Sequence, residues 1–253
     1  MTAETPEPSL DAIRREIDWI DGQILRLLVQ RTAASARVKA TKAHDGSIAS
    51  SPFRPAREAA MMRRLIEVAG SALNPELLVR LWRVILSASI QSQAPVTLHL
   101  DWVLGQDLAM RLMVAQHFCD MAVEIHNNPS RALDAVGRAQ GDLALIAPDA
   151  DWAAGFASGA AGSAQVTATL PVFATGGQPQ LLVFGHAAPQ PSGDDETLLL
   201  LPCEKVTVAG ALWQAHSGAA TLASLAGFLD HAPPLHPGAR IVGRYPRPLK
   251  VSP

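Results

Sequence analysis

The stretch LDAIRREIDWIDGQILRLLVQRTAASARVKATKA, residues 10–43, decides the fold of the first third of the chain. Its apolar residues recur at alternating steps of three and four, which is the repeat of one face of an α-helix. These residues are Leu10, Ile13, Ile17, Ile20, Ile24, Leu27, Ala34 and Val38. A helix of this length extends about 50 Å at roughly 1.5 Å per residue. Because a short helical unit cannot cover such a stripe, we expect a partner helix of equal length and therefore a dimer.

Two shorter helices are predicted to follow. Pro55 suits the first turn of a helix that runs to about residue 69. Asn74 and Pro75 form a second helix start, and apolar residues then recur as far as Gln93. The apolar stripe of this third helix is Leu78, Leu81, Ile85 and Ala88. We place a domain boundary near Pro95, because the residue before a proline is disfavoured in a helix.

The remainder of the chain has a different character. Only three of the 18 glycines fall in residues 1–95. Residues 96–147 alternate between β-like and helical segments, which is typical of a parallel α/β layer. The predicted segments are 96–103, 107–117, 122–126, 130–139 and 143–147. We therefore predict a multidomain protein, with an all-α domain at residues 1–95 and an α/β domain at residues 96–253.

Composition excludes several classes of protein. The chain has 21 Lys and Arg against 23 Asp and Glu, so no large basic surface is available for nucleic acid. Its apolar runs are too short to cross a membrane, and the N-terminus has no signal-peptide core. Cys119 and Cys203 are far apart, which suits a reducing cytoplasm. The histidines show no metal-binding spacing, so we expect a cytoplasmic protein with no metal and no cofactor.

Charged residues interrupt the apolar stripe of the first helix. Arg31 occupies a stripe position, and its side chain either extends to water or awaits an anion. Lys42 lies 11 residues further, within about 20° of the same face and about 16 Å along the axis. Arg14 precedes Arg31 by about 25 Å. In a straight helix Arg14 either serves a site built by a second subunit or, with Arg15, is an ordinary solvated charge.

Four more polar residues fall at the helix ends. Arg57 and Glu58 begin the second helix, where a glutamate also favours the helix dipole. Ser89 and Gln93 continue the third helix's stripe, where they form a polar patch or mark fraying. With Arg14, Arg31 and Lys42, these residues supply several cations, one carboxylate and two neutral groups. The set lacks a paired acid and base or a nucleophile, so it suits binding of a small dianion.

These residues also resemble a known family. The motifs are IRREID at 13–18, Asp21, Arg31, KATK at 39–42, RE at 57–58 and S-x-x-x-Q at 89–93. They resemble the all-helical chorismate mutases, which form intertwined dimers. The resemblance implies the three-helix fold, a homodimer and a cofactor-free isomerase. The implied reaction is the Claisen rearrangement of chorismate to prephenate in phenylalanine and tyrosine biosynthesis.

The resemblance also assigns roles by position. Arg31 and the partner subunit's Arg14 would hold the two substrate carboxylates. Lys42 and Gln93 would be the catalytic donors to the ether oxygen, where negative charge grows as the C–O bond breaks. Glu58 would accept from the ring hydroxyl.

The remaining members of the set, Arg57 and Ser89, would complete the carboxylate shell. The isochorismate-pyruvate lyases share this fold and its cations, and they stay an alternative. Glu58 and the longer loop at residues 43–54 favour the mutase.

Three segments of the second half resemble prephenate dehydratase with its regulatory ACT domain. They are residues 132–148, residues 181–201, and the pair 210–213 and 241–246, which resembles the first helix and last strand of the ACT domain. The required Thr-Arg-Phe is replaced by Pro179-Gln180-Leu181, so dehydratase activity is not expected. We predict a degenerate dehydratase-like domain with a truncated ACT-like end. A regulatory or scaffold dimer that binds an aromatic amino acid effector without catalysis is a further alternative.

Overall fold

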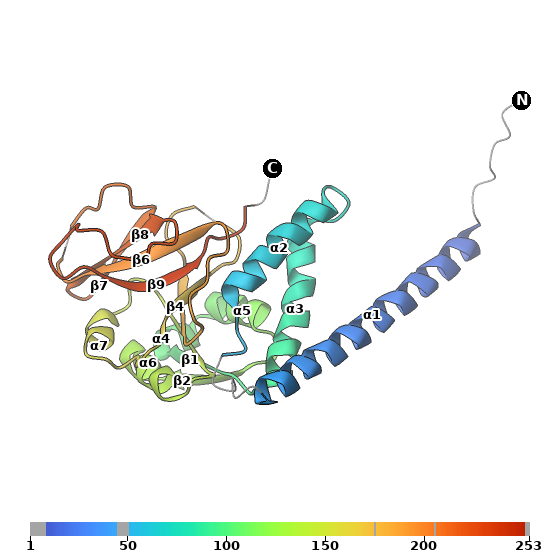
Figure 1. The fold of residues 1–253 in the computed structure, drawn as a ribbon, viewed down its shortest axis with the longest axis horizontal. Helices are drawn as coiled ribbons and strands as arrows, with labels where there is room; N and C mark the ends of the chain where they lie inside the picture. The colour runs from blue at the N-terminus through green and yellow to red at the C-terminus, as the bar shows by residue number, and fades with distance from the viewer. Residues whose placement is uncertain (1–8, 45–50, 175, 205, 251–253) are drawn as a thin grey trace, which may run out of the picture. The chain divides into compact units, whose positions relative to one another are not determined.

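A computed structural model describes residues 9–44, 51–174, 176–204 and 206–250, without the side chains of residues 39 and 42–44. The chain divides into two compact units, residues 1–48 and 49–253. The first unit contains helix α1 (Leu10–His44), and the second contains all other elements (Figure 1). Among the described residues, no helix combines the length and the apolar character needed to cross a bilayer.

Helix α1 agrees with its predicted bounds and is 35 residues long. Its large apolar side chains are open to solvent in the single chain, with exposed fractions from 37% for Leu28 to 65% for Trp19. The exposed set is Leu10, Ile13, Ile17, Trp19, Ile20, Ile24, Leu25, Leu27, Leu28, Val29 and Val38. Trp19, Leu25 and Val29 lie off the predicted stripe, so apolar surface spreads over more than one side of α1.

Helices α2 (Pro55–Ala69) and α3 (Pro75–Gln93) also begin and end as predicted. The Asn74 side chain accepts hydrogen bonds from the amides of Glu76 and Leu77, at 2.8 and 3.2 Å, and so caps α3. The two helices lie side by side and pack around the buried side chains of Met62 and Leu78.

The apolar stripe of α3 is largely uncovered in the single chain. Leu78 is buried, but Leu81 and Ala88 are exposed and Ile85 is half-buried. The buried residues of α3 are Leu78, Val79, Arg83, Ser87 and Ile90. This different face is buried because α3 packs against α5 of the α/β region. The face that turns inward therefore includes an arginine and a serine.

The rest of the second unit is built on one nine-stranded sheet of order β2-β1-β3-β5-β4-β9-β6-β8-β7. Its strands are β1 (Thr97–Asp101), β2 (Ala122–His126), β3 (Leu143–Ile146), β4 (Gln165–Leu170), β5 (Leu181–Gly185), β6 (Asp195–Leu201), β7 (Trp213–Ser217), β8 (Ala220–Ala226) and β9 (Arg240–Pro246). Strands β2, β1 and β3 are parallel, which confirms the predicted parallel layer. Beyond β3, the paired strands are antiparallel, apart from a single parallel contact between β4 and β9.

At β3, an interior strand, both faces of the sheet are covered. In β3, Ala144 and Ile146 enter one apolar core with α6 (Pro129–Arg138), while Leu143 and Leu145 enter another with residues of α5 (Leu108–His117). Alternate side chains of a strand point to opposite faces, so the fully apolar β3 is buried on both. The sequence predicted a strand at residues 143–147, and the structure has one at Leu143–Ile146.

Two details differ from the sequence-based expectations. A short helix α4 (Trp102–Gln106) follows β1, capped by the Asp101 carboxylate, which accepts from the Leu104 amide at 3.0 Å. The segment at 210–213, expected to begin a helix, instead leads into β7, while 241–246 lies in a strand as expected. Residue 213 pairs with Ser224 of β8, so backbone pairing to the neighbouring strand replaces helix formation.

Helices α2 and α3 belong to the same compact unit as the sheet. Helix α2 contacts β9, and α3 contacts α5. The domain boundary that the sequence placed near Pro95 stays a prediction. One surface of α2 and α3 packs against the α/β region. Another surface, on α3, keeps exposed apolar side chains.

Candidate functional site

The cations of α1 occupy different surroundings. The Arg14 guanidinium lies on an exposed face, where it pairs with the Asp11 carboxylate at 3.5 Å. Arg31 is half-buried, and desolvation lowers the pKa of its guanidinium from the ordinary value. Arginine stays charged despite such a shift. The side chain of Lys42 lies outside the described residues, so its role stays a prediction.

The polar pair of α3 is assembled as the spacing predicts. Ser89 and Gln93 are both half-buried and lie one turn apart. The Ser89 hydroxyl donates to the Ile85 carbonyl at 2.8 Å, and the Gln93 amide donates to the Ser89 carbonyl at 3.0 Å. Both bonds are made within the helix. A Gln93 amide has two N–H donors, so it can donate to a ligand as well.

Glu58 and Arg57 point to different environments at the start of α2. Arg57 is exposed, whereas Glu58 is buried. The Glu58 carboxylate accepts a hydrogen bond from Nη1 of Arg83 at 2.9 Å, with both side chains under a tenth exposed. The same Arg83 nitrogen lies 3.0 Å from Nε2 of His117. Glu58 therefore belongs to a buried polar cluster that joins α2, α3 and the end of α5.

The protonation state of His117 follows from this contact. An arginine can only donate, so Nε2 of His117 accepts and the ring is neutral, with its hydrogen on Nδ1. Burial, and then the positive charge of Arg83, hold the pKa of His117 well below 6.5. A neutral histidine lets Glu58 and Arg83 form a balanced pair of opposite charges.

Sequence reasoning missed Arg83 and His117. A signal was present, because Val79, Arg83, Ser87 and Ile90 recur at helical steps of four, four and three. A second stripe of this kind, carrying one charge, is compatible with an exposed face. Only the packing of α3 against α5 reveals that the stripe is buried.

The cavity beside Glu58 is small, about 40 Å³. Ligand pockets for drug-sized molecules have volumes of about 300 Å³ or more. The buried cluster within residues 49–253 therefore cannot hold a chorismate-sized ligand without further space.

Two larger hollows lie elsewhere in the second unit. One, of about 310 Å³, is lined by Arg54, Thr167, His186 and Arg244 among others. The other, of about 290 Å³, is lined by Phe173, Glu196, Trp213 and Arg247 among others. Each combines apolar walls with charged groups, as small-molecule sites do.

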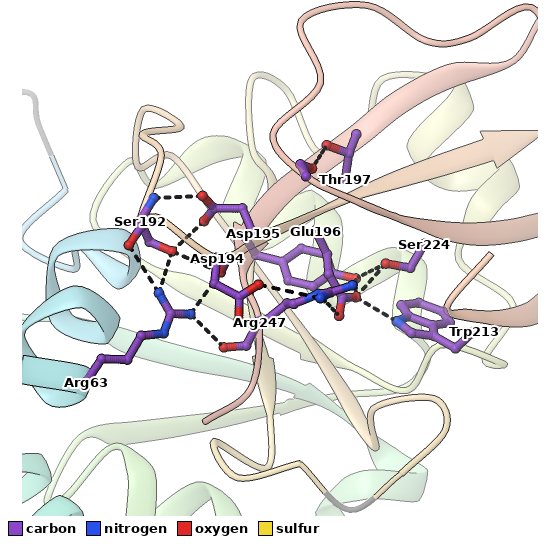
Figure 2. A network of polar contacts seen from close by, with 11 residues as sticks. Arg63, Ser192, Asp194, Asp195, Glu196, Thr197, Trp213, Ser224 and Arg247 are labelled. Carbon is purple, nitrogen blue, oxygen red and sulfur yellow. Dashed lines mark hydrogen bonds and ion pairs between the residues drawn. The ribbon is translucent and has the colours of Figure 1, made fainter. Parts of the chain in front are cut away.

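The second hollow borders a polar network that fixes α2 to the sheet (Figure 2). The Arg63 guanidinium of α2 donates to the carbonyls of Ser192, Asp194 and Arg247, at 3.1, 2.8 and 3.1 Å. It also donates to the Ser192 hydroxyl at 3.0 Å. One side chain thus connects α2 to the residues before β6 and after β9.

Glu196 is the centre of the adjoining part of this network. One carboxylate oxygen accepts from the Trp213 indole at 3.1 Å and the Ser224 hydroxyl at 2.5 Å (Figure 2). The same oxygen accepts from the Tyr245 hydroxyl at 3.2 Å. Its other oxygen lies 3.5 Å from Nε of Arg247. Burial and the Glu196 charge raise the pKa of Tyr245 well above its usual value, so the phenol stays a donor. The wall of the hollow is rigid and already hydrogen-bonded.

The comparisons with known proteins concern mainly the helical region. Residues 13–94 match the family described as chorismate mutase type II. The chain is 31% identical over 96 residues to the bifunctional chorismate mutase/prephenate dehydratase of Neisseria gonorrhoeae (strain ATCC 700825 / FA 1090). That match covers 38% of this chain and only 25% of the relative. Residues 13–94 therefore form a chorismate mutase type II domain, followed by a mixed α/β region.

A solved structure of GqqA, described as a novel type of quorum quenching acylase, is also similar. The match has 15% identity and a TM-score of 0.38, and it covers 60% of this chain and 95% of that one. A likeness at this level is too weak to indicate a shared function.

Replacing Glu58 with alanine should strongly destabilise the second unit. The change would leave the buried Arg83 without its counter-charge, and breaking such a pair costs about 3–5 kcal/mol. Chemical denaturation of the full chain would measure the loss. Glu76→Ala is the matched control, because its pair with Arg80 is exposed and 3.6 Å long and is worth about 0–1 kcal/mol. Equal losses in the two variants would contradict the buried-pair assignment.

The low pKa of His117 should make stability depend on pH. Below about pH 6.5 the unfolded chain binds a proton at this residue that the folded chain does not. The free energy of unfolding should therefore fall as the pH drops below this value, by up to about 1.4 kcal/mol per unit. His117→Gln keeps an acceptor for Arg83 and should remove this part of the slope. Chemical denaturation between pH 7 and 5 measures the free energy of unfolding of both proteins. Identical pH profiles of wild type and variant would refute the role of His117 in this slope.

Proposed function

We propose that this protein is a dimeric chorismate mutase, an isomerase that converts chorismate to prephenate. The observation that carries the proposal is the chorismate mutase type II match across all three helices, residues 13–94. All seven polar residues that the resemblance assigns lie within this match. The chain spans about a quarter of its bifunctional relative, so activity is inferred for the helical region alone.

The chemistry of the reaction suits the groups that α1 and α3 supply. A pericyclic rearrangement transfers no proton, so it needs no general base. It needs the substrate held in its compact form and donors aimed at the oxygen that gains negative charge. Arg31 and Arg14 are proposed to hold the carboxylates, while Lys42 and Gln93 donate to the ether oxygen. Gln93 is neutral, so its role requires no protonation step.

The exposed apolar surface of α1 supports a dimer. Eleven large apolar side chains of this helix are open to solvent in the single chain. Burying apolar surface is favourable by about 25 cal/mol for each Å², so packing against a partner would stabilise such a helix. Because apolar residues lie on more than one side of α1, we propose that it is enclosed between helices of two subunits. In this arrangement Arg14 completes the site of the other subunit.

A second open surface supports the same proposal. On α3, Leu77, Leu81 and Val84 are each about half exposed. This surface adjoins the stripe that continues to Ser89 and Gln93. We propose that the dimer covers it and thereby encloses the polar pair.

Glu58 fits the proposed site less simply. Its carboxylate is paired with Arg83, although a carboxylate can accept about four hydrogen bonds. We propose that Glu58 keeps this pair and accepts from the ring hydroxyl with its remaining capacity. If it does not, Glu58 gives no preference for chorismate, and isochorismate becomes the substrate to test.

An effector-binding role is the second candidate. The hollow of about 290 Å³ beside Glu196 and Arg247 combines an apolar wall with both signs of charge, which suits an amino acid. Titration of the full chain with phenylalanine in a calorimeter tests it. An absence of heat at millimolar concentration would rule out the effector.

Purified full-length protein should consume chorismate and yield prephenate. Lys42→Ala and Gln93→Ala should each lower kcat by about 10²–10³-fold, the loss typical of removing one oxyanion donor. The fall in chorismate absorbance measures the rate, and chromatography identifies the product.

Arg37→Ala on α1 and Gln91→Ala on α3 are the controls for these variants. Both are exposed residues of the same helices and should retain wild-type turnover. Full activity in Lys42→Ala would overturn the site assignment. Pyruvate release from isochorismate, with no prephenate formed, would favour the lyase.

The full chain should be a dimer in analytical ultracentrifugation. Ile24→Glu places a charge in the middle of the apolar surface of α1 and should produce monomers with little activity. Arg15→Glu changes a charge outside the predicted apolar stripe of α1 and should stay dimeric. A wild-type protein that sediments as a monomer would contradict the role of Arg14 in a shared site.

A further inference from the structure

The edge of the sheet carries a cluster of metal-binding side chains far from the helical site in sequence. Strands β1 and β2 are parallel, and their register sets His99 directly beside Glu124. His126 lies two residues beyond Glu124 and therefore on the same face of β2. One ligand atom from each of these three residues lies within 4.8 Å of the others.

The two imidazoles face each other through ring nitrogens. Nδ1 of His99 lies 2.9 Å from Nε2 of His126. The Glu124 carboxylate lies 3.7 Å from the first nitrogen and 3.8 Å from the second. Three potential ligands thus surround one point, two of them nitrogen and one oxygen.

The hydrogen bonds of His99 determine which of its nitrogens is free to bind a cation. Nε2 of His99 lies 3.2 Å from a carboxylate oxygen of Asp142. The other oxygen of Asp142 accepts from the Thr97 amide at 2.8 Å, which fixes the carboxylate in place. Because a carboxylate only accepts, Nε2 carries the hydrogen, and Nδ1 of the neutral ring presents its lone pair toward His126 and Glu124.

This arrangement has the parts of a metal centre. A ligating histidine typically donates its other N–H to a carboxylate, which sets the tautomer and makes the ring a better ligand. We propose that His99, Glu124 and His126 bind a divalent transition-metal ion, zinc above all, with Asp142 orienting His99. Two imidazoles and one carboxylate match the nitrogen and oxygen ligands that zinc takes, with a fourth position left for water.

Metal binding requires His126 to carry its hydrogen on Nδ1 instead of Nε2, together with a small change in geometry. Two nitrogens on a tetrahedral zinc, with bonds of about 2.0–2.1 Å, lie roughly 3.4 Å apart. The present separation of 2.9 Å means that the rings would move apart by about half an ångström. Glu124 is 60% exposed, so its side chain can close on the ion and the open position faces solvent.

An imidazole coordinates a metal in its neutral form. The bound ion would join β2, the edge strand of the sheet, to β1.

Zinc alone, titrated into chelator-treated full-length protein, tests the proposal. A non-chelating reductant keeps Cys119 and Cys203 as free thiols. Calorimetry should give one ion per chain. Cobalt, as a spectroscopic substitute, should show no thiolate charge-transfer band, because the ligands are nitrogen and oxygen.

Variants separate this site from adventitious binding. His126→Ala and Glu124→Gln each remove a ligand at an accessible edge strand and should weaken zinc binding. For His126→Ala the loss should exceed the roughly 10–100-fold that follows removal of an outer-shell partner. Asp142→Asn keeps an acceptor for Thr97 and should cost about 10–100-fold. His231→Ala, at an exposed histidine outside the cluster, should bind as wild type does.

Three results would each overturn the proposal. The first is the absence of zinc uptake by folded wild-type protein. The second is affinity that is unchanged in both His126→Ala and Glu124→Gln, and the third is a cobalt spectrum dominated by thiolate. In each case the imidazoles share a hydrogen bond and nothing more.

Discussion

Helix α1 is 35 residues long and has leucine and isoleucine side chains open to water. Exposure of this apolar surface is unfavourable, so any state that leaves the helix uncovered is destabilised. For α1 the penalty is large, because its apolar residues extend over nearly its whole length. Arg31 is placed within this surface and is already partly desolvated. In the proposed dimer, covering α1 would enclose that charge further, and an anionic ligand would compensate for part of the lost hydration. The proposed partner helix would cover the apolar surface, and the proposed ligand would balance the charge within it.

Helices α2 and α3 each have a packed side, and α3 also has an exposed apolar side. One side of α2 and α3 is fixed to the α/β region by the Glu58–Arg83 pair and by the four hydrogen bonds of Arg63. Another side of α3 keeps exposed apolar residues that lead to Ser89 and Gln93. Rigid attachment on one side can hold the polar pair in place for a ligand on the other. The α/β region thus holds α2 and α3 through buried polar contacts.

The central strands and the edge strand of the sheet differ in burial and in polarity. Central strands such as β3 are apolar on both faces, because helices and neighbouring segments cover both. Strand β2 is at the edge, and its polar residues can face one another and the His99 side chain of β1. Charged groups on an edge strand also limit unwanted pairing with other chains. The His99, Glu124 and His126 cluster fits this position whether or not it also binds an ion.

The sequence by itself determined the bounds of α1, α2 and α3, because caps, prolines and helical periodicity are local signals. It also determined the parallel β1–β3 layer, since alternating strands and helices have few other solutions. Tertiary structure alone decided that Arg83 and Ser87 turn inward, that residue 213 enters a strand, and that His99 meets His126. Each of these depends on segments distant in the chain, and no periodicity within one segment specifies which partner it will meet.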